Sequence, residues 1–196
     1  TVLIATSLKE EYSLNFWDIF SITIKAYKNY DMNSILIYNK SMKIYEGSCA
    51  CGQVNYSISE KPYFTQACHC KDCKKSTGSS YVIHSMIHED DFSIDGEVDS
   101  TDLSTGSGAG QRAYFCTMCG VYIYCKYKIA EPEKRIALRT KTLNDHNRFP
   151  PQAHIFVKDK DPWINLKGFK NCFDTMYDRD KIWPAKSLKK LKEKNV

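Results

Sequence analysis

Seven cysteines stand in three closely spaced groups, and their spacing predicts two zinc sites. The groups have the patterns C-x-C, C-x-C-x-x-C and C-x-x-C, and they are formed by Cys49 and Cys51, by Cys68, Cys70 and Cys73, and by Cys116 and Cys119. Thiolates at such spacings hold zinc. A closed tetrahedral site takes four sulfurs, so the other three leave a second ion with an open position, and open positions are where zinc does chemistry.

The geometry of short segments indicates which sulfurs belong together. Side chains at i and i+2 of an extended segment share a face, so Cys68 and Cys70 can bind one ion. Cys73 reaches the same ion if the chain turns at Lys71-Asp72, whereas His69 would point away. The two remaining cysteine pairs are then the arms of a long chain loop, which a structural ion would clamp.

A disulfide framework is the competing interpretation of so many cysteines. The total of nine is odd, the pairs are too close in sequence to bridge comfortably within themselves, and no secretory signal precedes them. We therefore expect reduced thiols and a reducing compartment, the cytoplasm or the nucleus. Cys125 and Cys172 lie outside the groups, and a lone cysteine is most often a small buried hydrophobe.

The cysteine groups lie in sequence blocks that resemble a known family. Residues 46–52 read E-G-S-C-A-C-G, residues 67–73 read A-C-H-C-K-D-C, and residues 114–120 read Y-F-C-T-M-C-G. With later blocks at 142–145, 151–156 and 162–163, residues 45 to 166 resemble the glutathione-dependent formaldehyde-activating enzymes, the family that includes centromere protein V. The chain departs from the family pattern at Ala50 and Lys141, and neither position is an expected ligand.

The resemblance implies a mainly β, zinc-stapled domain with two zinc ions per chain. Cys49, Cys51, Cys116 and Cys119 would hold the structural ion, and Cys68, Cys70 and Cys73 the catalytic ion. It also implies glutathione as the thiol and formaldehyde as the aldehyde, which would join to S-hydroxymethylglutathione in the reaction of a carbon–sulfur lyase. Three thiolates on Zn²⁺ carry a formal charge of about −1, which favours one more soft thiolate over ionisation of water.

A nearby group must handle the proton of the new hydroxyl. The candidates, in order of proximity to the motif, are His69, Asp72 and His154. His69 could instead hydrogen-bond a ligand sulfur or a backbone carbonyl. His154 stands among apolar residues, as core histidines commonly do.

The other histidines and the cations of the later blocks carry weaker signals. The histidines have polar neighbours in the sequence, so we expect them to face water: His84, His88 and His146. Three cations could meet the carboxylates of glutathione or could lie on an exposed strand face: Arg135, Arg139 and Lys141.

Two other function classes stay open. The chain could be a non-catalytic zinc-stapled module that binds protein or nucleic acid. Alternatively, Cys73 or His69 could complete another closed arrangement, which would leave two structural ions and no activity.

The net charge of +5 comes from the last residues. Residues 181–196 hold six lysines and one glutamate, which leaves 22 basic and 22 acidic residues in residues 1–180. We expect this tail to be a solvated, partly frayed helix with Pro184 in its first turn. Binding of the tail to an acidic partner or nucleic acid is the alternative.

From residue 44 onward, the sequence predicts short β strands, and these must position the cysteines. Val54, Tyr56 and Ile58 alternate with polar residues, and residues 121–125 also alternate, which is the period-2 pattern of half-buried strands. Asp95-Gly96 marks a turn, and residues 106–110 (G-S-G-A-G) mark a hairpin loop. Short strands between turns predict a sandwich-like arrangement of sheets with short helical extensions at the termini.

The sequence divides into three segments. Residues 44–168 form the predicted zinc-binding domain, residues 1–43 an N-terminal extension, and residues 169–196 the basic C-terminal tail. The N-terminal segment has neither a run of 18 apolar residues nor the pattern of a signal peptide. Because Met42 stands just before the family blocks, we expect it to be the natural start, with residues 1–41 either a gene-model artefact or a lineage-specific extension.

Overall fold

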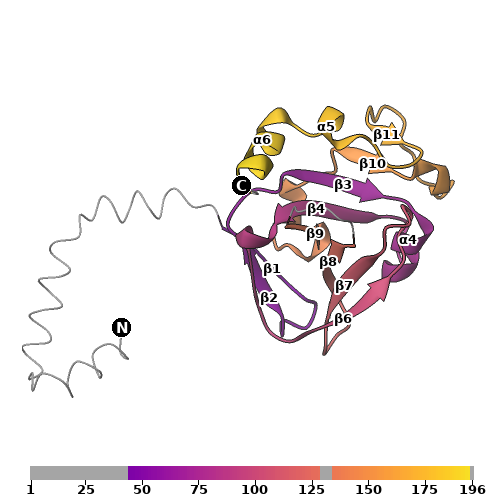
Figure 1. Ribbon diagram of the computed structural model, residues 1–196. Coiled ribbons are helices and arrows are strands. Elements are labelled where there is room, and N and C mark those ends of the chain that lie inside the picture. The colour runs from indigo at the N-terminus through magenta and orange to yellow at the C-terminus, as the bar shows by residue number, and fades with distance from the viewer. Residues whose placement is uncertain (1–43, 129–133, 195–196) are drawn as a thin grey trace, which may run out of the picture. The chain divides into compact units, whose positions relative to one another are not determined.

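The computed structural model describes residues 44–128 and 134–194, which fold into two β-sheets with a few short helices (Figure 1). The prediction of a mainly β protein is therefore confirmed. The predicted N-terminal extension, residues 1–43 with Met42, lies outside the described residues. In the part of the chain that the structure describes, no helix has the length and apolar character needed to span a membrane.

The smaller sheet has three antiparallel strands, in the order β1-β2-β5. They are β1 (Tyr45–Ser48), β2 (Asn55–Ile58) and β5 (Phe92–Asp95). The larger sheet has the order β11-β10-β3-β4-β9-β8-β7-β6 and is antiparallel except that β10 is parallel to both of its neighbours. Its strands are β3 (Phe64–Cys68), β4 (Val82–His88), β6 (Val98–Leu103), β7 (Gln111–Cys116), β8 (Tyr122–Tyr127), β9 (Arg135–Arg139), β10 (Ala153–Ile155) and β11 (Cys172–Phe173).

The helical elements are short and lie between strands or after them. The α-helices are α4 (Lys71–Thr77), α5 (Arg179–Ile182) and α6 (Ala185–Lys194). The 3₁₀ turns are η1 (Glu89–Asp91), η2 (Thr140–Thr142), η3 (His146–Arg148) and η4 (Val157–Asp159). The helical extension predicted at the C-terminus is confirmed by α5 and α6.

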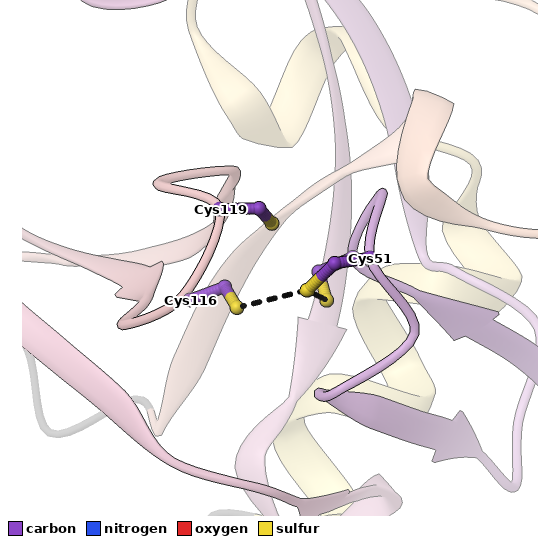
Figure 2. Close-up of side chains that lie close together, drawn as sticks. Cys51, Cys116 and Cys119 are labelled. Carbon is purple, nitrogen blue, oxygen red and sulfur yellow. Dashed lines mark hydrogen bonds between the residues drawn. The ribbon is translucent and has the colours of Figure 1, made fainter.

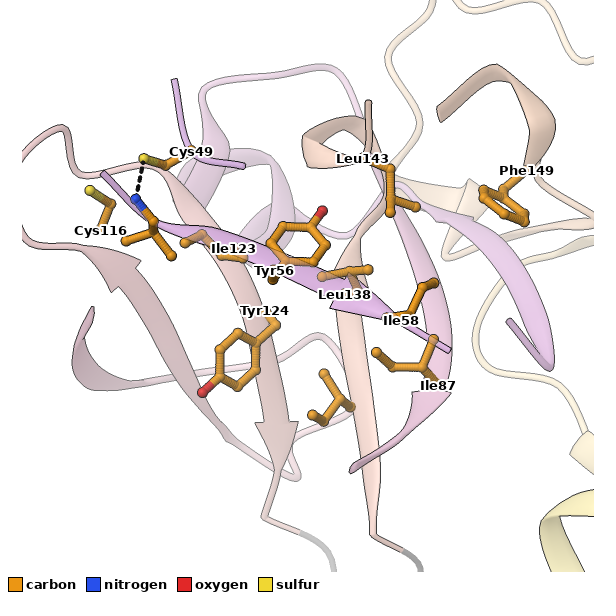
Figure 3. Packing of buried hydrophobic residues seen from close by; sticks show 12 residues of the cluster. Cys49, Tyr56, Ile58, Ile87, Cys116, Ile123, Tyr124, Leu138, Leu143 and Phe149 are labelled. Carbon is orange, nitrogen blue, oxygen red and sulfur yellow. Dashed lines mark hydrogen bonds between the residues drawn. The ribbon is translucent and has the colours of Figure 1, made fainter. Parts of the chain in front are cut away.

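The larger sheet is buried on both faces, because alternate residues of its strands join different apolar clusters. One cluster fills the space between the two sheets, where Tyr56 and Ile58 of β2 meet Ile87, Ile123 and Leu138 of the larger sheet (Figure 3). The other face carries a second cluster that includes residues of α6 and the segment before it. Figure 1 shows β1 and β2 on one side of the larger sheet and α5 and α6 on the other.

The strand patterns read from the sequence are correct in position but not always in exposure. Tyr56 and Ile58 are buried on β2 while the residues between and before them are not, as the alternation predicted. The prediction that residues 121–125 are half-buried is wrong, because Tyr122, Ile123, Tyr124 and Cys125 are all buried. The tyrosine rings of β8 are buried on both faces of the strand. The alternating pattern treated these tyrosines as polar because each ends in a hydroxyl, and it therefore predicted exposure.

The C-terminal tail is docked rather than solvated and frayed, so that prediction is wrong. Trp183 and Leu191 are buried, and the Trp183 ring stacks on Phe64 of β3 with 5.4 Å between ring centroids. Two lysines of the tail form ion pairs with the body of the domain: Lys190 with Glu60, and Lys194 with Asp91. The tail therefore covers one face of the larger sheet, and part of its charge is balanced there.

Candidate metal centres and substrate pocket

The first cysteine cluster joins the turns of two hairpins that belong to different sheets. Cys49 and Cys51 lie in the β1–β2 turn of the smaller sheet, and Cys116 and Cys119 lie at the β7–β8 turn of the larger sheet. Both turns are built alike: the first cysteine donates its N–H to a carbonyl five residues later, at 2.9 Å in the β1–β2 turn and 3.0 Å in the β7–β8 turn. A site formed by these four sulfurs would link the two sheets.

The distances within this cluster fit zinc. The sulfurs of Cys49 and Cys51 are 3.4 Å apart, and those of Cys51 and Cys116 are 3.7 Å apart, far longer than the roughly 2.0 Å of a disulfide bond. A tetrahedral zinc ion with four sulfurs at about 2.3 Å places them roughly 3.8 Å from one another. Figure 2 shows the sulfurs of Cys51, Cys116 and Cys119 around one common space. The donor set and its spacing therefore suit a closed zinc site.

Backbone amides favour the thiolate form in this cluster. Burial raises the pKa of Cys49, but the N–H of Val54, which donates to its sulfur at 3.2 Å, and the thiols of Cys51 and Cys116 lower that pKa to about 6 overall. Thiolate is the form that binds a metal. A turn that directs N–H groups at sulfur is thus prepared for zinc before the ion arrives.

The second cluster forms where β3 ends and α4 begins. Cys68 is the last residue of β3, Cys70 caps the N-terminus of α4, and Cys73 lies in the first turn of that helix, so the chain turns at Lys71-Asp72 as expected. The Cys70 sulfur accepts the N–H of Cys73 at 3.4 Å, and all three side chains are buried. The spacing C-x-C-x-x-C thus produces a three-sulfur group from a strand end and one helical turn.

Negative charge in the second cluster is centred on Cys70. Contacts with the thiols of Cys68 and Cys73 lower the pKa of Cys70 to about 2, and the same contact with Cys70 raises the pKa of Cys68. The contacts among the three sulfurs therefore favour the thiolate form of Cys70. Three sulfurs so close together suit a cation that removes the remaining two protons.

Two buried residues, His84 and Arg139, adjoin this cluster. His84 was expected to face water, but it is fully buried, and its Nε2 lies 3.7 Å from the sulfur of Cys73. Its ligating atom and those of Cys68 and Cys73 lie within 4.8 Å of one another. Arg139, for which the sequence left open a contact with the carboxylates of glutathione or an exposed strand face, is 4 % exposed and contacts the His84 ring.

His88 and His146 were also expected to face water, and this holds for only one of them. His88 is also fully buried, whereas His146 is partly exposed. The pattern V-I-H-S-M-I-H of β4 did hold a signal, because His84 shares its strand face with Val82 and Met86, which are buried. Ser85, the polar neighbour of His84 in the sequence, conceals this because it lies on the opposite face of the strand.

Two of the three candidates for proton transfer, His69 and His154, contact each other, and Asp72 lies elsewhere. The Nε2 of His69 lies 2.9 Å from Nδ1 of His154, and both rings are buried. Burial, followed by the charge of His154, lowers the pKa of His69 to about 4, and burial lowers the pKa of His154. Asp72 accepts a hydrogen bond from the Ser104 hydroxyl at 3.1 Å. None of these three residues is among the described residues that line the pocket beside the cluster.

A pocket of about 440 Å³ lies beside the second cluster, and Cys68, Cys70 and Cys73 are all among the residues that line it. Gln66, Gln111 and Arg135 contribute from the larger sheet, and Phe156, which follows β10, adds an apolar side. The loop between β6 and β7 closes one end, and the segment between β11 and α6 closes another. The lining residues from these two segments are Thr105, Gly106, Ser107, Ala109, Met176, Tyr177, Asp178, Arg179, Asp180 and Trp183.

The β6–β7 loop is a hairpin loop, as the glycines predicted, but it also touches a cysteine of the cluster. A Cβ atom added to Gly106 would lie 2.6 Å from the Cβ of Cys70 and 3.1 Å from its sulfur. The backbone N–H of Gly106 also helps to lower the pKa of Cys70. Only glycine allows the loop to come this close.

The two cysteines outside the clusters behave differently from one another. Cys125 is fully buried, as expected of a small hydrophobe, and burial raises the pKa of its thiol. Cys172 is half-buried at the start of β11. All nine cysteines are free thiols, and seven of them lie in the two clusters.

Comparisons with known proteins match the same part of the chain. A family model described as "Glutathione-dependent formaldehyde-activating enzyme" matches residues 44–159, more than half of the sequence. A Halomonas elongata protein named "Putative glutathione-dependent formaldehyde-activating enzyme" is 25% identical over 136 residues, which span 65% of this chain and 85% of that protein. A crystal structure of a Rhodobacter sphaeroides protein aligns with a TM-score of 0.40 and 17% identity, over 65% of this chain and 98% of that one.

Proposed function

Because the chain belongs to the glutathione-dependent formaldehyde-activating enzyme family, we propose that it is a carbon–sulfur lyase that acts on glutathione or a related thiol and its adduct with formaldehyde. The observation that carries this proposal is that Cys68, Cys70 and Cys73 all line one pocket of about 440 Å³. Pockets of this size hold small ligands. A cluster that opens into such a pocket can offer its metal ion to a substrate.

We propose two zinc ions per chain. The four sulfurs of Cys49, Cys51, Cys116 and Cys119 would close a structural site, and the other three sulfurs would hold a second ion with one position left for the substrate. When bound there, the second ion supplies a positive charge that favours the thiolate form of an incoming thiol. Because both sites need reduced cysteines, we place the protein in a reducing compartment, the cytoplasm or the nucleus.

The reaction needs no oxidant. The sulfur of the thiol forms a bond to the aldehyde carbon, and the carbonyl oxygen takes up a proton as the thiol loses one. The reverse reaction breaks the same carbon–sulfur bond. The protein must therefore bind the thiol, hold its sulfur beside the cluster and leave room for a one-carbon aldehyde.

Charged groups in the pocket suit a zwitterionic thiol such as glutathione, which carries two carboxylates and one ammonium group. Arg135 and Arg179 contribute cationic groups to the lining, and Asp178 and Asp180 contribute anionic ones. A guanidinium pairs well with a carboxylate, and a carboxylate with an ammonium. Of the three cations considered from the sequence, Arg135 lines the pocket, whereas Arg139 and Lys141 are outside its lining.

Gln111 offers the pocket a hydrogen-bond acceptor. The residue is 2 % exposed and lines the pocket, and its Oε1 has no hydrogen-bond partner among the described residues. A buried acceptor without a partner costs free energy, so such groups commonly mark a place that a ligand completes. A peptide N–H of the thiol substrate would supply the missing donor.

His69 fits a supporting role better than contact with the substrate. Its ring contacts His154, and it is not among the described residues that line the pocket. We propose that the His69–His154 pair fixes the turn that carries the cluster.

The test is exchange spectroscopy by NMR, with ¹³C-formaldehyde and glutathione at equilibrium. The zinc-loaded protein should speed the exchange between free formaldehyde and the hydroxymethyl adduct, and Cys70→Ser should abolish that effect. Cys172→Ser, which changes a cysteine outside both clusters, should leave it unchanged. An exchange rate that the wild-type protein does not alter would refute the proposed reaction.

A further inference from the structure

We infer that His84 is a positioning residue of the second cluster, which donates a proton from Nε2 to the Cys73 sulfur while Arg139 holds it in that role. The fourth position of the metal ion thereby stays open for the thiol. The inference rests on the proposed zinc site at Cys68, Cys70 and Cys73. It also decides between an open and a closed site, because His84 is close enough to serve as a fourth ligand.

The two strands place His84 and Arg139 directly opposite each other. They are register partners in the antiparallel pair β4–β9, so their side chains leave the sheet on the same face. Cys68 is the partner of Val82 in the adjacent pair β3–β4, which puts Cys68 on that face as well. The sheet thus brings a cysteine, a histidine and an arginine together from three neighbouring strands.

Contacts with Arg139 determine which form of the imidazole is present. The Nη1 of Arg139 lies 2.8 Å from Nδ1 and 3.1 Å from Nε2 of His84. A guanidinium has only donors, so the nearer nitrogen, Nδ1, accepts its proton and carries the lone pair of the ring. A neutral imidazole with an acceptor at Nδ1 carries its own proton at Nε2.

The proton at Nε2 faces the Cys73 sulfur at 3.7 Å. A nitrogen that carries a proton has no lone pair for a metal ion, so His84 cannot ligate while Arg139 is in place. It can instead donate an N–H···S hydrogen bond to the thiolate. Hydrogen bonds of this kind to a ligand hold it in position and strengthen metal binding.

The burial of Arg139 agrees with an anionic cluster next to it. Its guanidinium lies over the ring of Tyr122, 3.6 Å from the centroid, and its Nε and Nη2 have no hydrogen-bond partner among the described residues. A buried cation is costly unless a negative charge compensates it. Three thiolates with one Zn²⁺ would supply a formal charge of about −1, which would balance the guanidinium.

X-ray absorption spectroscopy at the zinc edge tests this assignment without any substrate. The wild-type protein with two zinc ions should show sulfur ligands and no outer-shell scattering from imidazole. A clear imidazole contribution in the wild-type spectrum would overturn the inference. Because glutathione is absent, this result is independent of whether the protein catalyses the proposed reaction.

Variants of His84 separate a hydrogen-bond donor from a ligand. His84→Gln can accept from Arg139 and donate to the sulfur, so it should keep zinc affinity at the second site close to that of the wild type. His84→Ala should lower that affinity about 10- to 100-fold, as the loss of a partner that orients a ligand does. Equal losses in His84→Gln and His84→Ala would contradict a donor role.

Arg139→Met provides the converse test. Without the guanidinium, the lone pair of His84 is free to turn toward the metal, so imidazole scattering should appear and should vanish again in Arg139→Met/His84→Ala. Arg148→Met, which removes a surface guanidinium over Tyr45, is the matched control and should give the wild-type spectrum. If a folded Arg139→Met protein gains no imidazole scattering, Arg139 does not hold the site open.

Discussion

The sulfurs of Cys51 and Cys116 lie 3.7 Å apart, although 65 positions separate the two residues in the sequence. One sulfur comes from a turn of the smaller sheet and the other from a turn of the larger sheet. An ion held between them would close a long loop and fix one sheet on the other. The cluster beside the pocket does not link distant segments, because its three cysteines come from six consecutive residues.

The two clusters should therefore differ in their effect on stability. We expect Cys51→Ser to lower the free energy of unfolding by about 4 kcal/mol, a large effect of the kind that loss of a structural metal causes. Cys70→Ser should cost much less and remove activity instead. Thermal and denaturant unfolding of both zinc-loaded variants will measure the difference, with Cys172→Ser as the control. Similar losses of stability in Cys51→Ser and Cys70→Ser would argue for two structural sites.

Gly106→Ala should disturb the second site alone. Its new Cβ would lie 2.6 Å from the Cβ of Cys70, closer than such atoms approach, so the loop or the cysteine must move. We expect zinc content to fall from about two ions per chain toward one, with the four-cysteine site still loaded. Ser107→Ala, in the same loop, is the control. Full zinc content in Gly106→Ala would show that the close approach does not shape the site.

Replacement of Gln111 should have opposite effects on stability and on binding. Gln111→Leu removes a buried acceptor without a partner, so the free energy of unfolding should stay the same or rise by about 1 kcal/mol. The thiol substrate would lose one hydrogen bond, and its Kd should rise roughly fivefold.

Gln152→Leu is the matched control for this pair of effects. The Oε1 of Gln152 accepts the N–H of Thr65 at 3.1 Å and lies outside the pocket lining. It should lower stability and leave thiol binding unchanged. Calorimetric titration and urea unfolding of both variants will decide, and a Gln111→Leu protein that is less stable but binds normally would assign Gln111 a purely structural role.

Buried histidines predict an acid-sensitive fold. Burial lowers the pKa of His154 below its ordinary value of 6.5, so the folded state binds fewer protons than the unfolded state as the pH falls below 6.5. Stability must then fall with decreasing pH in that range. His154→Asn should reduce the slope of stability against pH, by the equivalent of at most one proton. His146→Asn, at a partly exposed site, should leave that slope unchanged.

Urea unfolding between pH 7.5 and 5.5 measures this slope. Release of zinc by acid affects all three proteins, so the comparison between variants isolates the histidine. An unchanged slope in His154→Asn would mean that His154 takes up its proton as readily in the folded protein as in the unfolded chain.

The sequence was sufficient for the features that depend on local spacing. C-x-C and C-x-x-C bring sulfurs together because only two or three positions separate them, so the sequence alone predicts the three local groups of cysteines. In the structure, Cys68 and Cys73 also lie close to His84, which the sequence did not predict. The mainly β fold also follows from short strands between turns. These features can be predicted without knowing which distant segments pack against one another.

The features that failed depend on packing between distant segments. His84 and Arg139 meet only because β4 pairs with β9, and no local pattern shows that pairing. The docked tail was missed for a related reason: its six lysines suggested a solvated helix, while Leu188 and Leu191, three residues apart, already marked an apolar face. Charged side chains on either side of an apolar helix face do not prevent that face from being buried.

The measurement that tests the central claim most directly is zinc content per chain together with calorimetric titration of glutathione into the zinc-loaded protein. We predict two zinc ions and saturable binding of glutathione that is lost in Cys70→Ser and kept in Cys172→Ser. One tightly held ion, or two ions with no binding of glutathione, would contradict an open site at Cys68, Cys70 and Cys73 and would make the domain a zinc-stapled structural module.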